Sequence, residues 1–293
     1  MLESLPNSAR FKTQLIPRAA ALFVFSWLCA AASLAQSPSI SPADRPISTS
    51  LATAAGGGDT AASAPANTDK PIVIGFLGGH VDRANSHHLE VQLAQKLRDE
   101  FGASITAETF ENRHYPDAYN RILTLLDTDR DGRLSPEEKN RARIILYGHS
   151  WGGAAVLALA RRLRAIGIPV CLTIQVDSVA HFGQDDSRIP PNVAKAVNFY
   201  QPQGPIRGES AIQPDDPVHT EIVGNFRFDY SPDQRTCPGY PWWDRYFMKG
   251  HIQIECDPKV WSQVESLIRT ELPAAATTSA TALPSPPQPS NRP

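Results

Sequence analysis

Ser150 lies in the pentapeptide Gly148-His149-Ser150-Trp151-Gly152, a pattern from which a nucleophilic serine can be built. The apolar segment 143–147 precedes it, and an alanine-rich segment typical of a helix follows it. A strand, a sharp turn and a helix in this order form a nucleophile elbow, in which the flanking glycines let the backbone fold back. The sequence therefore predicts a nucleophile at Ser150, with an ordinary structural turn as the alternative.

A serine hydroxyl is a poor nucleophile unless a histidine takes its proton and a carboxylate orients that histidine. Asp177 ends the apolar segment 171–176, which is typical of a strand, so its carboxylate is expected at the same sheet edge as Ser150. His251 precedes the last expected helix and is predicted to lie on a loop. Asp177 and His251 are therefore the candidate acid and base.

Other carboxylates and histidines are alternatives for these two roles. They are Asp185 and Asp186 for the acid, and His149, His181 and His219 for the base. His149 lies inside the pentapeptide and is expected to point away from the nucleophile as a packed side chain. His181 is only a few residues from the candidate acid, so a shared loop is expected rather than a facing position. Asp177 itself could instead cap a turn through Ser178.

Backbone amides are expected to stabilise the negative charge that develops on an acyl oxygen. The amide of Trp151, at the start of the helix after Ser150, is the first candidate. Gly78 and Gly79 follow the first expected strand and offer a second donor, because glycine lets the backbone approach a substrate closely. A plain tight turn is the alternative for this glycine pair.

Residues 127–138 carry a second motif, with the spacing of an EF-hand calcium loop. Carboxylates occupy loop positions one, three and five, glycine position six, an apolar residue position eight and glutamate position twelve. The predicted ligands are Asp127, Asp129, Asp131, the carbonyl of Arg133, Ser135 through water, and Glu138. Lys139 stands where an apolar residue usually anchors the exiting helix, and no second loop accompanies this one. We therefore expect a structural calcium rather than a calcium sensor, with a solvated acidic turn as the alternative.

Alternating strand and helix patterns are expected to position these residues. Strands are predicted at 72–76, 105–110, 144–147, 170–176 and 196–200, and helices at 86–101, 118–126, 151–166 and 260–272. Residues 220–230 alternate like a hairpin or an edge strand. Alternation with short connections predicts an α/β domain with a mostly parallel sheet covered on both faces.

The two ends of the chain differ in composition from the predicted α/β domain at 71–272. Residues 1–35 combine a basic leader, an apolar segment and small residues, which is typical of a cleaved signal peptide. Residues 36–70 and 273–293 are rich in Ser, Ala, Thr, Pro and Gly and are expected to be disordered. The protein is thus predicted to be secreted or periplasmic, with no transmembrane segment once the signal is removed.

The net charge bears on which partners the protein could bind, and the cysteines bear on whether it works in an oxidising compartment. A formal net charge of -2 does not indicate binding to nucleic acid or to an anionic membrane. Of the four cysteines, Cys29 belongs to the signal and Cys171 to an apolar strand. Cys237 and Cys256 flank a loop-rich stretch and could form a disulfide in an oxidising compartment. The spacing leaves open whether they pair.

Together these motifs resemble those of the α/β-hydrolase superfamily over most of the folded unit. The resemblance implies an α/β-hydrolase-like three-layer sandwich in which Ser150 is acylated by an ester and released by water, with Asp177 and His251 completing a triad. No pair of strands precedes Ile72, so the sheet looks trimmed at its N-terminal strands, as in small lipases and cutinases. The acid also comes one strand after the serine, sooner than in many members.

The predicted function is therefore an exported serine hydrolase, an esterase or lipase acting on a small-molecule or lipid ester and supported by structural calcium. Thioester or amide hydrolysis fits the same triad. A non-catalytic, calcium-stabilised exported binding protein is the alternative of a different class. Several aromatic residues could either line an acyl pocket or pack a loop: Trp151, Tyr240, Trp242, Trp243 and Phe247.

Overall fold

The computed structural model describes residues 70–181, 183–231 and 235–273. The predicted signal peptide, nearly all of the predicted linker and nearly all of the predicted tail lie outside these residues. No helix within the described ranges is long and apolar enough to cross a membrane.

Six strands build the main sheet and two short strands pair beside it. The main strands are β1 (Ile72–Leu77), β2 (Thr106–Glu111), β3 (Ile144–His149), β4 (Val170–Val176), β6 (Val193–Tyr200) and β8 (Glu221–Arg227), and the short pair is β5 (Arg188–Ile189) and β7 (Gln213–Pro214). The α-helices are α1 (Leu89–Phe101), α2 (Tyr115–Leu126), α3 (Pro136–Asn140), α4 (Trp151–Arg164), α5 (Trp242–Phe247), α6 (Lys249–Glu255) and α7 (Pro258–Thr270), with 3-10 turns η1 (Gly102–Ser104) and η2 (Asn112–His114).

The main sheet has the strand order β2-β1-β3-β4-β6-β8, and every neighbouring pair is parallel. The sheet is therefore fully parallel, where a mostly parallel one was predicted. The segment predicted as a hairpin or edge strand forms β8 at one edge. Because all six strands run the same way, the residues that follow β1, β3 and β4 share one edge of the sheet, where ligands of such folds bind.

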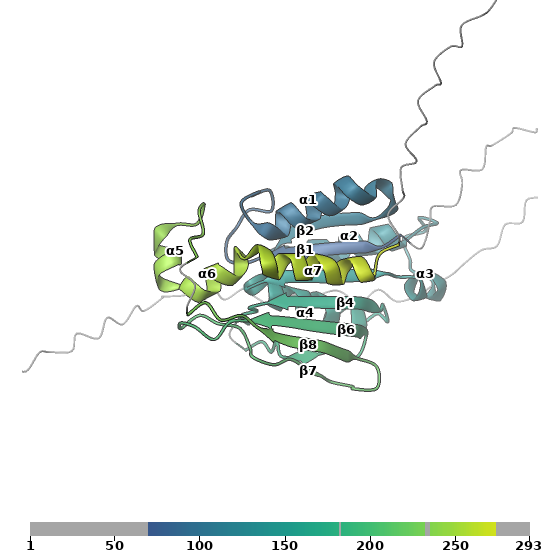
Figure 1. The fold of residues 1–293 in the computed structure, drawn as a ribbon. Helices are drawn as coiled ribbons and strands as arrows, with labels where there is room; N and C mark the ends of the chain where they lie inside the picture. Colours follow the sequence, from purple (N-terminus) through teal and green to yellow (C-terminus); the bar gives the residue numbers. More distant parts are fainter. Residues whose placement is uncertain (1–69, 182, 232–234, 274–293) are drawn as a thin grey trace, which may run out of the picture. The chain divides into compact units, whose positions relative to one another are not determined.

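Helices cover both faces of the sheet (Figure 1), as predicted. In β1, Ile72, Ile74 and Phe76 belong to the core shared with α2 and α4, whereas Val73 belongs to the core shared with α1 and α7. All six residues of β1 and of β3 are buried, the pattern expected of parallel strands with a layer of helices on each side. The predicted three-layer α/β sandwich is thus confirmed.

The predicted loop around His251 is wrong, because His251 lies within the short helix α6. The segment from Ile252 to Glu255 alternates apolar and polar residues, which hides a helical period in a helix this short. α5 precedes it, and both helices lie at the end of the sheet that carries the strand arrowheads of β4 and β6 (Figure 1). His251 consequently reaches this sheet edge from a helix.

Candidate active site

Ser150 forms the turn between β3 and α4. Its φ is 56°, a conformation that a residue with a side chain adopts only at an energetic cost. The turn is held on both sides, because Ser150 N donates to Val176 O at 3.0 Å and Gly153 N donates to Ser150 O at 2.9 Å. A side chain at Gly148 would place its Cβ 2.5 Å from the backbone of Gly152. The glycines around Ser150 therefore occupy positions where a larger residue would break the turn, as the elbow pattern predicts.

The structure brings the three predicted triad residues within hydrogen-bonding distance. His251 Nε2 lies 2.8 Å from Ser150 Oγ, and His251 Nδ1 lies 2.6 Å from Asp177 Oδ2. The three residues come from the end of β3, the end of β4 and α6, and all are buried. With Nδ1 donating to the carboxylate, Nε2 of the same imidazole is free to accept the serine proton.

Asp177 accepts hydrogen bonds from other groups besides His251. Its carboxylate also accepts hydrogen bonds from Gln201 Nε2 and Gly208 N, both at 2.8 Å. Burial alone would raise the pKa of Asp177, but the bonds from His251, Gln201 and Gly208 outweigh it and lower the pKa below its ordinary value. Asp177 is therefore ionised at neutral pH. Sequence reasoning missed Gln201 and Gly208, since they belong to the connection after β6 and carry no motif of their own.

Asp185, Asp186, His181 and His219 have partners outside this arrangement. Asp186 accepts a hydrogen bond from Ser178 at 2.5 Å, and Asp185 accepts from Ser187. His219 is paired with Asp216 at the surface. The ring of His181 lies against that of Trp151, with centroids 4.7 Å apart.

His149 is buried, as predicted for a packed side chain, but it also contacts the candidate base. Its ring centroid lies 4.5 Å from that of His251. Burial lowers the pKa of His149 to about 4, so the imidazole is neutral at neutral pH. His149 therefore presents an uncharged face to His251, a contact that the pentapeptide alone does not predict.

The predicted oxyanion loop lies directly against Ser150. A Cβ on Gly78 would sit 3.0 Å from Ser150 Cβ, and Gly79 has a φ of 52°. Asn112 fixes this loop by donating from Nδ2 to Gly79 O at 2.5 Å and to Leu77 O at 3.0 Å. On the other side, Trp151 is the first residue of α4, a position whose N–H group has no partner inside the helix.

A pocket of about 350 Å³ opens above Ser150 and His251. Its apolar wall includes Trp151, Tyr240, Ile206 and Met248. The rest of the predicted aromatic set is not in this wall. Trp242, Trp243 and Phe247 lie on α5 with 66%, 52% and 64% of their surface exposed.

Cys237 and Cys256 form a disulfide, with their Cα atoms 5.9 Å apart. Cys237 precedes α5, and Cys256 directly follows α6. Cys171 is the free cysteine of the described part of the chain. The disulfide therefore closes the segment that carries His251.

Replacing Cys237 and Cys256 together with serine is expected to lower the free energy of unfolding by about 3 kcal/mol, because the unfolded chain loses a crosslink over a short loop. Denaturant unfolding of the oxidised protein and of the double variant measures this difference. Cys171→Ser serves as the control. Equal stabilities of the double variant and the oxidised protein would contradict the prediction.

The predicted calcium loop folds tightly and groups part of its ligand set. One carboxylate oxygen each from Asp127, Asp129 and Asp131 lies within 4.8 Å of the other two. Gly132, with a φ of 78°, donates its N–H to Asp127 Oδ2 at 3.0 Å. These three side chains could hold a cation together without a large rearrangement.

Glu138, predicted as the twelfth-position ligand, is not in this cluster. Its carboxylate accepts from Thr128 N at 2.7 Å and from Ser135 N at 2.9 Å, and Ser135 Oγ accepts in turn from Glu138 N. The backbone N–H donors lower the pKa of Glu138 to about 2. A capping box at the start of α3 thus uses the side chain that a calcium ion would need, so the loop fits a cation only in part.

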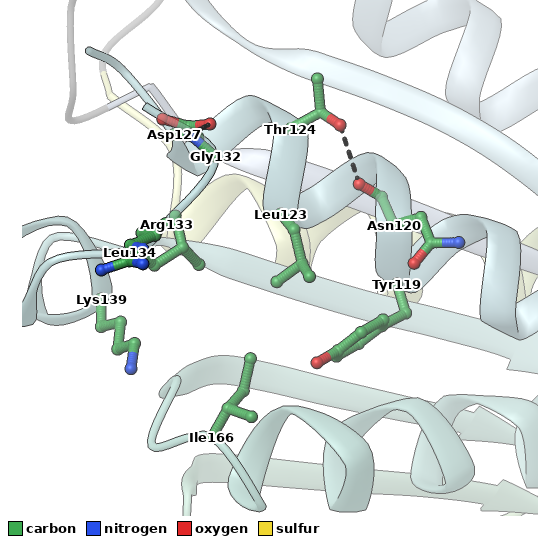
Figure 2. A pocket seen from close by; sticks show the side chains of 10 residues that line it. All are labelled: Tyr119, Asn120, Leu123, Thr124, Asp127, Gly132, Arg133, Leu134, Lys139 and Ile166. Carbon is green, nitrogen blue, oxygen red and sulfur yellow. Dashed lines mark hydrogen bonds between the residues drawn. The ribbon is translucent and has the colours of Figure 1, made fainter. Parts of the chain in front are cut away.

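A separate hollow of about 520 Å³ lies beside this loop (Figure 2). Asp127, Gly132 and Lys139 line it together with side chains of α2. It shares no lining residue with the pocket above Ser150. The hollow therefore belongs to the loop and does not extend the candidate active site.

No protein-family model matches the chain, and no curated protein matches it. The chain is similar to several solved structures at low sequence identity. A cutinase-like protein from Cryptococcus sp. is 12% identical, with 71% of this chain and 97% of that chain covered and a TM-score of 0.38. The RedJ thioesterase of Streptomyces coelicolor is 11% identical, with 71% and 92% covered and a TM-score of 0.38. An acetylxylan esterase is 11% identical, with 69% and 98% covered and a TM-score of 0.36.

Proposed function

We propose that this protein is a serine hydrolase that cleaves carboxylic esters. The observation that carries the proposal is the buried chain of hydrogen bonds from Ser150 through His251 to Asp177, with distances of 2.8 Å and 2.6 Å. A non-catalytic binding protein would have no need for a strained serine aligned with a histidine and an ionised carboxylate.

In the proposed reaction, Ser150 Oγ attacks the ester carbonyl carbon while His251 Nε2 takes the hydroxyl proton. Asp177 holds the other side of the imidazole and stabilises its positive charge. The tetrahedral intermediate then collapses: His251 returns the proton to the departing alcohol, and the acyl group remains on Ser150. Water attacks this acyl-enzyme with His251 again as the base, which releases the carboxylic acid and restores the serine.

The charge of the tetrahedral oxygen is met by backbone N–H groups in this mechanism. The amide of Trp151 supplies one donor from the start of α4, and Gly79 or Gly78 supplies the other from the opposite wall. The small separation between Gly78 and Ser150 supports this assignment, because only a residue without a side chain leaves room for the substrate oxygen.

The pocket favours an ester with a short to medium apolar acyl chain. Most of the exposed area of its wall is apolar, and its volume of about 350 Å³ is modest. Trp242, Trp243 and Phe247 on α5 are exposed, and their sequence neighbours Asp244 and Met248 line the pocket, so we propose that α5 offers further apolar surface to a longer lipid ester. Thioesters and amides are the runner-up substrates, since the triad alone does not select the leaving group.

Rapid-mixing kinetics with p-nitrophenyl esters test the proposal. The wild-type protein is expected to release a burst of p-nitrophenol equal to its own concentration and then to turn over more slowly, as an acyl-enzyme does. A series from acetate to decanoate then gives the acyl preference. Hydrolysis no faster than that caused by the urea-unfolded chain would overturn the proposal.

We also propose that the protein is exported. The signal-like segment 1–35 and the Cys237–Cys256 disulfide support this location, because disulfides persist in oxidising compartments. The mass of the chain from its native host tests it: loss of about the first 35 residues, the predicted signal peptide, is expected. An intact N-terminus in the cytosolic fraction would contradict it.

We propose that the loop 127–138 binds a structural calcium ion through Asp127, Asp129 and Asp131, completed by Arg133 O, Ser135 and Glu138. The grouped carboxylates support this assignment, and binding would require Glu138 to leave Thr128 and turn toward the ion. Calcium therefore competes with the capping box for this one side chain.

At calcium a hundredfold above its Kd, the melting temperature is expected to rise by about 5–10 °C relative to chelator-treated protein. Differential scanning calorimetry measures this shift, and Asp129→Asn should reduce it. Asp117→Asn, on an exposed acid of the neighbouring α2, is the matched control. An unchanged melting temperature at millimolar calcium would rule out the site.

A further inference from the structure

A second cluster of metal-ligating side chains lies in the wall of the candidate active-site pocket. His88, Glu90 and Glu255 are 8%, 0% and 3% exposed. One ligand atom from each of these side chains lies within 4.8 Å of the other two. His88 and Glu90 stand at the start of α1, and Glu255 ends α6. Residues far apart in the sequence thus bring an imidazole and two carboxylates to one buried point.

Hydrogen bonding within the described residues leaves this cluster incomplete. Glu255 pairs with His88 Nδ1, but neither carboxylate oxygen of Glu90 has a hydrogen-bond partner there. Burying a carboxylate without a partner is costly, and a second carboxylate beside it adds repulsion. Burial and Glu255 accordingly raise the pKa of Glu90. A cation between the three side chains would satisfy Glu90 and remove the repulsion.

The donor set indicates which cation fits. One imidazole nitrogen with two carboxylate oxygens suits a divalent first-row transition ion such as Zn²⁺, whereas calcium and magnesium prefer oxygen ligands alone. His88 and Glu255 also line the pocket of about 350 Å³ above Ser150. The pocket gives an ion a path of entry and leaves room for a water ligand on that side.

We propose that His88, Glu90 and Glu255 bind a divalent transition-metal cation of the zinc class in the wall of this pocket. The surroundings suit such a site. Tyr147 Oη donates to Glu90 O at 2.8 Å and holds the start of α1 in place. His149 Nδ1 lies 3.3 Å from Glu255 Oε2, but the two atoms do not form a hydrogen bond. Neither ring nitrogen of His149 has a hydrogen-bond partner among the described residues. His149 is thus a further nitrogen donor next to the site.

The site is distinct from the calcium loop in place and chemistry. The two clusters share no residue, and the loop offers carboxylates without an imidazole. Because metal content can be measured without any substrate, a failure of this proposal would leave the proposed ester hydrolysis untouched, and the converse also holds.

Isothermal titration of the chelator-treated full-length protein with ZnCl₂, in the presence of millimolar calcium, tests the proposal. One Zn²⁺ per chain is expected. Glu90→Gln keeps the size of the side chain but removes the anionic ligand, and it should weaken Zn²⁺ binding at least ~100-fold, more than the loss of a supporting residue outside the ligand set. Asp244→Asn, which alters another carboxylate of the same pocket, and Asp127→Asn should both bind Zn²⁺ like the wild type.

Thermal unfolding without metal adds a readout that separates the proposal from a purely structural cluster. If Glu90 serves only as a buried, protonated acid, Glu90→Gln will match the wild type both in stability and in its indifference to Zn²⁺, and the proposal falls. If Glu90→Gln does not fold, Zn²⁺ binding by His88→Gln and the metal content of the wild-type protein test the proposal instead. A wild-type protein that binds no stoichiometric Zn²⁺ overturns the proposal directly.

Discussion

Replacing Ser150 with alanine is expected to lower kcat for ester hydrolysis by at least ~10⁴-fold, since loss of a nucleophile removes nearly all of a triad's contribution. The side chain is small, and the turn is held by backbone hydrogen bonds to Val176 O and from Gly153 N, neither of which uses the hydroxyl. The variant should therefore fold like the wild type. Steady-state kinetics together with the melting temperature measure both effects.

Ser262→Ala is the matched control, because it removes an exposed serine hydroxyl from α7, outside the pocket above Ser150. It should retain the wild-type kcat. Hydrolysis by Ser150→Ala within tenfold of the wild type would mean that the ester is cleaved by another group.

Asp177→Asn is expected to lower kcat by about 10⁴-fold, the loss seen when the acid of a serine triad no longer selects the histidine tautomer. The amide retains the size of the side chain but does not stabilise the imidazolium of His251. Gln201 donates to Oδ2 and Gly208 to Oδ1, so an NH₂ group in place of either oxygen removes an acceptor and some stability should be lost as well. Kinetics at saturating ester separate this loss of kcat from a change in KM.

Asp186→Asn discriminates between the candidate acids. Asp186 is also buried, but it accepts a hydrogen bond from Ser178 rather than from a histidine. Its variant is expected to keep kcat within a few fold of the wild type, even where it unfolds more easily. A larger loss of kcat at Asp186 than at Asp177 would reassign the acid.

The nucleophile turn could be predicted from the sequence because its requirements are local. Gly148, Ser150 and Gly152 are neighbours in the chain, and each glycine is needed where a Cβ would collide with nearby backbone. The strands of the sheet could also be predicted from the sequence, since buried parallel strands appear as continuous apolar runs. The candidate acid Asp177 could be predicted in the same way, as a polar residue at the end of such a run.

Features that depend on contacts between segments far apart in the sequence could not be predicted in this way. Gln201 and Asn112 support the site from connections without a motif, and only the folded sheet edge brings them to Asp177 and Gly79. The short helix around His251 has too few residues to show a period. For Glu138 the motif predicts one role and the fold adds another. Its position in the loop matches that of a calcium ligand, but in the structure its carboxylate takes part in the capping box of α3.

A fluorophosphonate probe tests the central claim most directly, because it reacts with a serine only where a base activates the hydroxyl and an oxyanion site receives the phosphoryl oxygen. Serine Oγ bonds to phosphorus, fluoride leaves, and the serine proton passes to the histidine. We predict one adduct per folded chain, located by peptide mass spectrometry on Ser150, and none on the His251→Ala variant. Absence of labelling in the folded protein, or an adduct on another residue, would contradict the assignment of Ser150, His251 and Asp177 as a catalytic triad.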